Sequence, residues 1–218
     1  MRSNIAILMA DLSGYTALTE VHGAEKAATL VGKFMEMVKR SLVGDCRLHE
    51  RVGDQVVIVS SSAEQLAYTA TILFQETHKE EGFLPLHGGL HFGEIVEKNG
   101  DYYGSTINAT ARIMADAGKG KLLCSREFHE QLPVGDSFVF VNQGAKKFKN
   151  LSQPLHLFEM SCCIDNIQRV LVIDPICRML INEKSQALLL EHNGEEHYFC
   201  SESCKEIFKN NYSQGITG

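Results

Sequence analysis

The sequence predicts an α+β fold in which an antiparallel sheet carries two helices on one face. An apolar run, Ile5–Ala10, stops at the carboxylate Asp11, and its length suits a central strand covered on both faces. Two later segments, Ala24–Leu42 and Ala63–Lys79, place apolar residues at helical spacing with charged residues between them. The stretch between these helices is rich in valine, which favours a pair of strands.

This pair of strands consists of Cys46–Arg51 and Gln55–Ser60, joined by a tight turn with Asp54 at its tip. Another strand, Leu86–Gly93, follows the second helix, and Glu94–Lys98 continues it towards an Asn-Gly turn. The order β-α-β-β-α-β matches a ferredoxin-like arrangement. A loop then leads into a short helix, and the remaining expected elements are a strand, a short helix and two strands, at Lys121–Ser125, Arg126–Leu132, Ser137–Val141 and Leu155–Met160.

The composition is that of an ordinary globular protein. Of 218 residues, 44% are hydrophobic and 22% are charged, which is enough chain for one large domain alone or with a small second one. The net charge of −6 argues against nucleic-acid binding, which needs a basic stripe, and makes small molecules or proteins the expected partners. Because no apolar run is long enough for a signal peptide or a membrane span, we expect a soluble, cytoplasmic protein.

Two acidic residues, Asp11 and Asp54, each have two interpretations. Asp11 either caps the helix that follows it or emerges at the sheet edge as a ligand. Asp54 either belongs to an ordinary Gly-Asp turn or faces Asp11. If the hairpin pairs beside the first strand, the two carboxylates meet as hard oxygen ligands for Mg²⁺ or Mn²⁺, ions that also bind substrate phosphates.

Further polar residues lie in the second half of the chain. Asn108 and Arg112 are four positions apart, so they share one face of the short helix. An amide and a guanidinium so placed can bind a ribose or a phosphate, although a solvated helix surface is equally compatible with the pattern. The lysine-rich segment 144–151, which contains Lys149, is either a solvated basic turn or places a lysine on a polyphosphate.

Taken together, these residues resemble the motifs of the class III nucleotidyl cyclases. Five positions match in the family's order and spacing through residues 5–160: Asp11 in A-D-L-S-G-Y-T, Asp54 in R-V-G-D, Asn108 and Arg112 in I-N-x-x-x-R, and Lys149 in F-K-N-L. Each motif is short and unspecific alone, and the resemblance rests on the occurrence of all of them in order on a predicted fold that matches the family. It implies the ferredoxin-like nucleotidyl cyclase fold.

The resemblance also implies a reaction, the conversion of ATP or GTP to the 3′,5′-cyclic monophosphate and pyrophosphate. Asp11 and Asp54 would hold two Mg²⁺ or Mn²⁺ ions per site, which activate the ribose 3′-hydroxyl and neutralise the triphosphate. Asn108 would orient the ribose, Arg112 would stabilise charge at the attacked phosphorus, and Lys149 would bind the terminal phosphates. In this family the aspartates and the other three residues come from different subunits, so the implied assembly is a head-to-tail homodimer.

Three positions of the resemblance give a mixed signal about the substrate. Glu50 is the residue type of guanylate cyclases and can accept from guanine N1–H and N2–H, whereas Asp101 matches adenylate cyclases, where a carboxylate accepts from the adenine N6 amine. His87 replaces an arginine that binds the triphosphate in many relatives, and a mostly neutral histidine weakens that contact. The choice between ATP and GTP stays open.

The C-terminal segment resembles the YHS domain, a small metal-binding-type module of β-hairpin and helix. The resemblance rests on D-P-x-C-x-M at 174–179, with Arg178 where glycine is usual, and on F-C-S-x-x-C at 199–204. Of the seven cysteines, an odd number that suits reduced thiols or ligands, four show no ligand spacing and are expected to be structural: Cys46, Cys124, Cys162 and Cys163.

The other three cysteines, Cys177, Cys200 and Cys204, would bind Zn²⁺ or another soft metal as thiolates. The fourth ligand would be solvent or one of three nearby side chains, Asp174, His192 and His197. The alternative interpretation is that the cysteines are small buried residues of a compact module.

We therefore expect a cyclase domain at 1–161, a linker at 162–171 and a YHS domain at 172–212 that regulates cyclase turnover when it binds metal. Two alternative hypotheses remain. One is a catalytically weak or inactive cyclase-like protein that binds nucleotide and senses metal or redox state, which Glu50 and His87 favour. The other is a metallochaperone that the cyclase-like part only dimerises.

Overall fold

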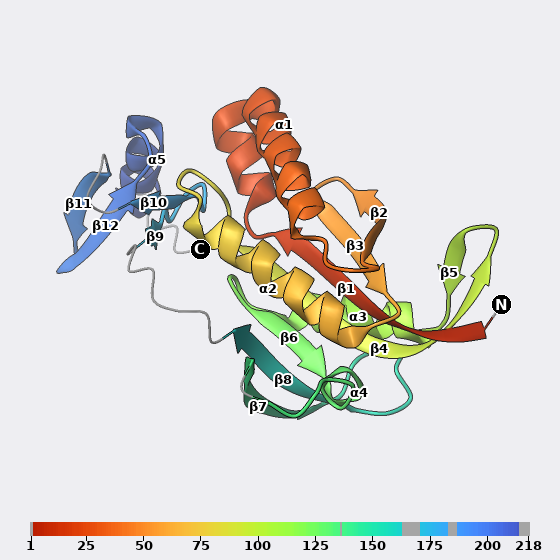
Figure 1. Ribbon diagram of the computed structural model, residues 1–218. Coiled ribbons are helices and arrows are strands. Elements are labelled where there is room, and N and C mark those ends of the chain that lie inside the picture. The colour runs from red at the N-terminus through yellow and green to blue at the C-terminus, as the bar shows by residue number, and fades with distance from the viewer. Residues whose placement is uncertain (1, 136, 163–170, 183–186, 214–218) are drawn as a thin grey trace.

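The chain forms one large sheet with helices on both faces and a smaller unit at its C-terminal end (Figure 1). The computed structural model describes residues 2–135, 137–162, 171–182 and 187–213. The linker expected at 162–171, with Cys163, lies almost wholly outside the described residues. No helix in the described part of the chain combines the length and apolarity needed to cross a bilayer.

The large sheet is built around β1 (Arg2–Leu12), which lies between two antiparallel neighbours. The strand order is β2-β3-β1-β4-β6-β8-β7, with β5 paired to the outer half of β4. All pairs are antiparallel except β4 with β6. The other strands are β2 (Arg47–Val52), β3 (Gln55–Ser60), β4 (Leu86–Lys98), β5 (Asp101–Tyr103), β6 (Leu122–Ser125), β7 (Phe138–Lys146) and β8 (Leu155–Cys162).

The two faces of β1 pack against different helices. Ala6, Leu8 and Ala10 belong to the larger core, which also contains the apolar sides of α1 (Tyr15–Ser41) and α2 (Ala63–Lys79). The alternate residues, including Ile7, belong to a second core with Met114 of α3 (Ser105–Asp116). Burial on both faces explains why β1 reads as a continuous apolar run. The predicted ferredoxin-like order is confirmed, and α3 covers the sheet face opposite to α1 and α2 (Figure 1).

Helix α1 begins earlier than the expected helix at Ala24. Its N-cap is Gly14 in the left-handed region (φ 99°), and no side chain caps it. The interpretation of Asp11 as the helix cap is therefore wrong. Gly23 interrupts α1 with φ 81° and ψ 167°, a conformation that only glycine adopts readily. The helical spacing of apolar residues was recognised only after Gly23, because the break places the turns before and after it on different helical phases.

Other boundaries differ more modestly from expectation. Helix α4 (Arg126–His129) ends before the expected Leu132. Strand β7 extends past the expected Val141 to Lys146, because an irregularity between Asn142 and Gly144, with Gly144 at φ 80°, lets the pairing with β8 resume.

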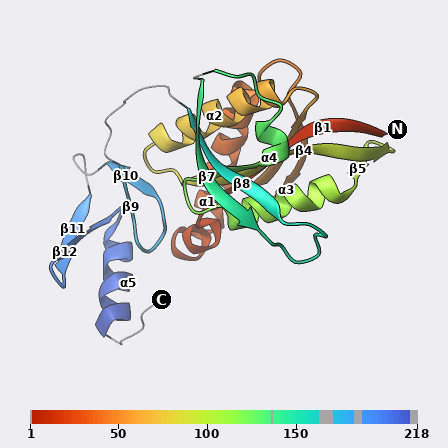
Figure 2. The same cartoon turned by 90° about the horizontal axis from the view of Figure 1, so that it is seen from below.

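The C-terminal module comprises two small hairpins and a helix, as the expected hairpin-plus-helix module implies. Strand β9 (Leu171–Ile173) pairs with β10 (Leu180–Asn182), and β11 (Leu188–His192) pairs with β12 (Glu195–Phe199). Helix α5 (Glu202–Ser213) follows β12. Figure 2 shows this module at one end of the large sheet. Of the expected structural cysteines, Cys46 and Cys124 are buried.

Buried His91 makes stability depend on pH. Burial lowers the pKa of this imidazole below 6.5 and outweighs the nearby Glu127 carboxylate, 3.8 Å away, while Ser125 Oγ lies 2.6 Å from Nδ1. The unfolded state therefore takes up the proton more readily, and stability falls as pH drops below about 6.5. We expect His91→Gln to lose less unfolding free energy than wild type between pH 7.5 and 5.5, measured by urea denaturation. Equal losses would contradict this assignment.

Candidate functional site

The candidate site is built around Asp11 and Asp54, which the sheet brings into contact. Asp11 is the penultimate residue of β1, and Asp54 follows Gly53 (φ 63°) in the turn between β2 and β3. Because β3 pairs directly with β1, the tip of the hairpin reaches the end of that strand. The two carboxyl groups are in hydrogen-bond contact, and both face the backbone N–H of Leu12.

The electrostatics of this pair favour a cation. Burial raises the pKa of Asp11, and burial together with the neighbouring Asp11 charge raises the pKa of Asp54 to about 6. Two half-buried carboxylates in contact repel each other unless a proton or a metal ion lies between them. Their oxygen donors are those that Mg²⁺ and Mn²⁺ prefer, so the residues fit the expected divalent site.

His87 lies beside the carboxylate pair. It is the cross-strand partner of Asp11 on β4, and its Nδ1 is 2.9 Å from Ser13 Oγ. Burial lowers the pKa of this imidazole more than the adjacent aspartates raise it. The side chain is therefore neutral at pH 7 and adds no fixed positive charge to the site.

The residues expected to read the base lie on neighbouring segments. The ring of Tyr102 stacks on His49 with a centroid distance of 4.3 Å, and the Tyr102 hydroxyl accepts from the guanidinium of Arg47. This contact holds β5 against β2, so Asp101 and Glu50, which adjoin the two stacked residues, are carried on packed segments. Both side chains are exposed.

The structure does not bring the other three expected residues to the carboxylates. Asn108 and Arg112 are exposed on α3, and Lys149 is exposed in the turn between β7 and β8. Within the described residues, no hydrogen bond or ion pair joins any of them to Asp11 or Asp54. One copy of the chain therefore holds two separate groups of candidate residues.

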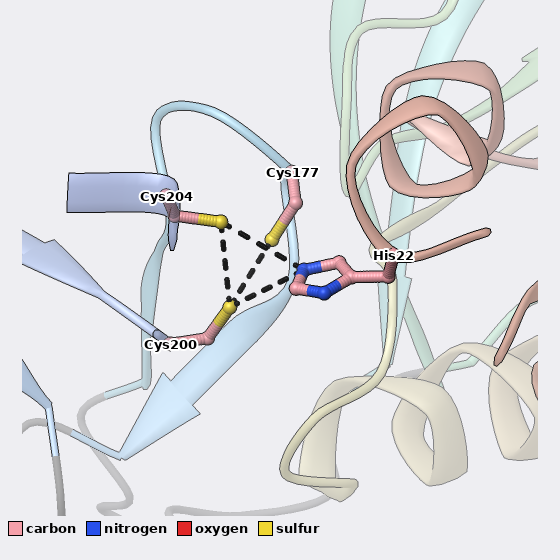
Figure 3. A group of neighbouring side chains, drawn as sticks. All are labelled: His22, Cys177, Cys200 and Cys204. Carbon is pink, nitrogen blue, oxygen red and sulfur yellow. Dashed lines mark hydrogen bonds between the residues drawn. The ribbon is translucent and has the colours of Figure 1, made fainter. Parts of the chain in front are cut away.

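A second cluster lies where the C-terminal module meets α1. Cys177, Cys200 and Cys204 converge there, and His22 from α1 completes the group (Figure 3). Sequence reasoning missed His22, because it lies 155 positions before Cys177 and no ligand motif includes it. The one local signal was its position directly before the helix-breaking Gly23.

The fourth ligands expected from the sequence lie elsewhere. The carboxylate of Asp174 accepts hydrogen bonds from the backbone N–H groups of Ile176, Cys177 and Cys200. The ring of His197 packs on Phe208, and that of His192 packs on Phe208 and Tyr212. Among the described residues, the group of potential donors around these cysteines contains none of the three.

The three thiols have different acidities. A hydrogen bond from Cys177 lowers the pKa of Cys200 to about 6, and the same contact raises that of Cys177. Burial raises the pKa of Cys204 to about 12. Cys200 is therefore the first thiolate of the cluster.

Comparison with known proteins agrees with this architecture. Curated relatives include an uncharacterized protein of Mycobacterium tuberculosis (32% identical, covering 69% of this chain), a pH-sensitive adenylate cyclase of the same species (26%, 72%) and an adenylate cyclase of Streptomyces coelicolor (32%, 59%). The chain spans only 39%, 40% and 34% of the lengths of these relatives.

Solved structures and a family model match different parts of the fold. A monomeric adenylate cyclase from Trypanosoma brucei superposes with a TM-score of 0.66 at 17% identity, covering 72% of this chain and 89% of that one. An adenylate/guanylate cyclase/hydrolase from Silicibacter pomeroyi gives 0.63 at 22% identity, covering 74% and 98%. The model described as the YHS domain matches residues 172–218. The large sheet thus has the class III cyclase catalytic fold, and the sequence resemblance to both families is confirmed.

Removal of one carboxylate should abolish stabilisation by divalent cations. We expect Mn²⁺ at about 100 times its dissociation constant to stabilise the wild-type protein by about 2.7 kcal/mol, because it binds only the folded carboxylate pair. Asp54→Asn should lose most of this effect and, in chelator, should melt no lower than wild type because the repulsion is gone. Thermal melts with and without Mn²⁺ measure both. An equal Mn²⁺ response in the variant would place the ion elsewhere.

Proposed function

We propose that the chain is a class III nucleotidyl cyclase that converts ATP or GTP to the 3′,5′-cyclic monophosphate and pyrophosphate. The observation that carries the proposal is the contacting pair Asp11 and Asp54 at the end of the central strand of a cyclase fold. Named adenylate cyclases among the relatives support the same class of reaction. We further propose a cyclase domain at 1–161, a linker at 162–171 and a regulatory YHS module beyond it.

The proposed chemistry follows from where charge develops. Asp11 and Asp54 would hold divalent ions, which would supply positive charge near the attacking 3′-oxygen and the departing pyrophosphate. Arg112 would donate to the oxygens of the phosphorus under attack, and Asn108 would hold the ribose. Lys149 would bind the terminal phosphates, a role that gains importance because His87 is neutral.

The separation of the two groups supports a composite site in a homodimer. The aspartates make no interaction with Asn108, Arg112 or Lys149 within the described chain, and the latter three are exposed. A head-to-tail dimer would place the exposed group of one subunit against the carboxylate pair of the other, and twofold symmetry would create two such sites.

The base would be read by Glu50 and Asp101, which lie on packed segments. Glu50 favours guanine and Asp101 favours adenine by their hydrogen-bonding capacity. ATP and GTP are therefore alternative substrates, and a direct assay distinguishes them.

The proposed activity predicts cyclic nucleotide formation in the presence of Mn²⁺. We expect product from ATP or GTP, not from CTP or UTP, when purified protein is assayed with each nucleotide. Asp54→Ala should abolish the product, and Arg112→Ala should lower turnover by about 10²–10³, the usual effect of removing a charge-stabilising donor. Preference for GTP would identify Glu50 as the dominant reader, and preference for ATP would identify Asp101. Nucleotide binding without product from any substrate would favour the sensor hypothesis.

The composite site predicts complementation between two inactive variants. When Asp54→Ala and Arg112→Ala proteins are mixed in equal amounts, half of the randomly formed dimers carry one intact site, so activity should return to about a quarter of wild type. The control is each variant mixed with itself. Failure to recover activity, with subunit exchange verified by differently tagged copies, would contradict sites shared between subunits.

A further inference from the structure

The strongest unassigned feature is the cluster of His22, Cys177, Cys200 and Cys204. Its four potential donor atoms all lie within 4.8 Å of one another (Figure 3). Three come from the C-terminal module and one from α1 of the large domain. Cys177 and Cys204 are buried, whereas His22 and Cys200 are partly exposed, so an ion could enter from solvent.

Four of the six spacings between the donors are close to the edges of a tetrahedron around zinc, and the other two lie within 4.8 Å. With Zn–S near 2.3 Å and Zn–N near 2.0–2.1 Å, tetrahedral geometry requires S···S edges of about 3.8 Å and S···N edges of about 3.6 Å. Cys200 Sγ lies 3.4 Å from Cys177 Sγ and 3.7 Å from Cys204 Sγ. His22 Nε2 lies 3.6 Å from the sulfur of Cys200 and 3.7 Å from that of Cys204.

The surrounding backbone holds the cysteines in this arrangement. The buried carboxylate of Asp174 is 2.7 Å from the backbone nitrogen of Ile176, 3.1 Å from that of Cys177 and 2.8 Å from that of Cys200, which ties the two cysteine loops together. Cys204 lies in the first turn of α5, and its backbone N–H donates to Ser201 Oγ at 3.3 Å, which holds this residue at the start of the helix.

The fourth donor is oriented by the break in α1. Gly23 has a non-helical backbone conformation, so His22 is the last residue of a short first segment of α1. The ring of His22 points towards the three sulfurs (Figure 3). A continuous helix would carry the chain onwards in a different direction. The glycine conformation is thus matched to the position of the imidazole.

We propose that His22, Cys177, Cys200 and Cys204 form a Cys₃His zinc site that fastens the C-terminal module to α1. Three thiolates and one imidazole are the donors of structural zinc sites, whereas Mg²⁺ and Mn²⁺ prefer oxygen. The donor set is closed, with four protein ligands, which is the pattern of a structural rather than a catalytic zinc. The proposal does not depend on the cyclase reaction.

The fastened module touches the loop that follows Asp11. A Cβ on Gly14 would lie 2.5 Å from the Cβ of Arg178, so the side chain of Arg178 packs directly on the backbone of Gly14. Arg178 itself is left-handed (φ 69°), which explains why glycine is usual at this position. Leu180 adds two backbone hydrogen bonds, from Gly82 N–H and to Phe83 C=O. Zinc would stabilise these contacts, because the module that carries the three cysteine ligands also carries Arg178 and Leu180.

The test measures zinc affinity in the full chain without nucleotide. Wild type should bind one zinc per chain at this site, and His22→Ala should weaken its affinity, measured by chelator competition, by at least about tenfold. His192→Ala is the matched control, because its ring packs on Phe208 and Tyr212, and should leave the affinity unchanged. His22→Cys should restore tight binding with a fourth thiolate.

Two further measurements separate an interdomain site from a local one. Co²⁺ substitution should give a four-coordinate thiolate spectrum that shifts in His22→Ala. Removal of zinc by a chelator should increase the rate of amide hydrogen exchange at residues 15–22 in wild type. It should leave that rate unchanged in His22→Ala, which lacks the α1 ligand. Unchanged affinity and spectrum in His22→Ala would overturn the proposal, as would absence of zinc binding by folded wild type or weakened affinity in His192→Ala alone.

Discussion

Strand β1 is paired with β4 along its whole length and with β3 over Ala6–Ala10, and the register of these pairings sets the positions of the site residues. Pairing with β3 brings Asp54 to Asp11, and pairing with β4 places His87 opposite Asp11. The turn after the strand begins α1 at Gly14, where the C-terminal module docks. A shift of one residue in this register would move Asp11 to the opposite face of the sheet and separate the carboxylates.

The two clusters differ in the physical problem that they present. The carboxylate pair places two like charges in partial burial, which a hard cation relieves. The cysteine cluster offers softer donors, three sulfurs and one imidazole nitrogen, which is the number of ligands that a four-coordinate zinc site requires. Each cluster is therefore suited to a different ion, and the fold separates them by the first turns of α1.

The sequence predicted the central elements well because their signals are local. The predicted bounds of α2 and β3 match the observed ones, and those predicted for β2 were one residue too early at each end. The start of α1 was missed because Gly23 breaks its periodicity, and the opposite placement of α3 depends on long-range packing. The contact of Asp11 with Asp54 was predicted from the hairpin, whereas His22 could not be, because only tertiary structure brings it to the cysteines.

The large sequence separation of the proposed zinc ligands also determines when, during folding, the site can form. His22 and Cys204 are 182 residues apart, so the proposed site cannot close while the ribosome still holds the last cysteine. The strands of the sheet all precede the module, so they can pair before that moment, and the larger core is completed when module residues such as Cys177, Phe199 and Phe208 join it. Metal insertion would thus follow the pairing of the strands, and a cell short of zinc would accumulate chains whose sheet has formed and whose module is unfastened.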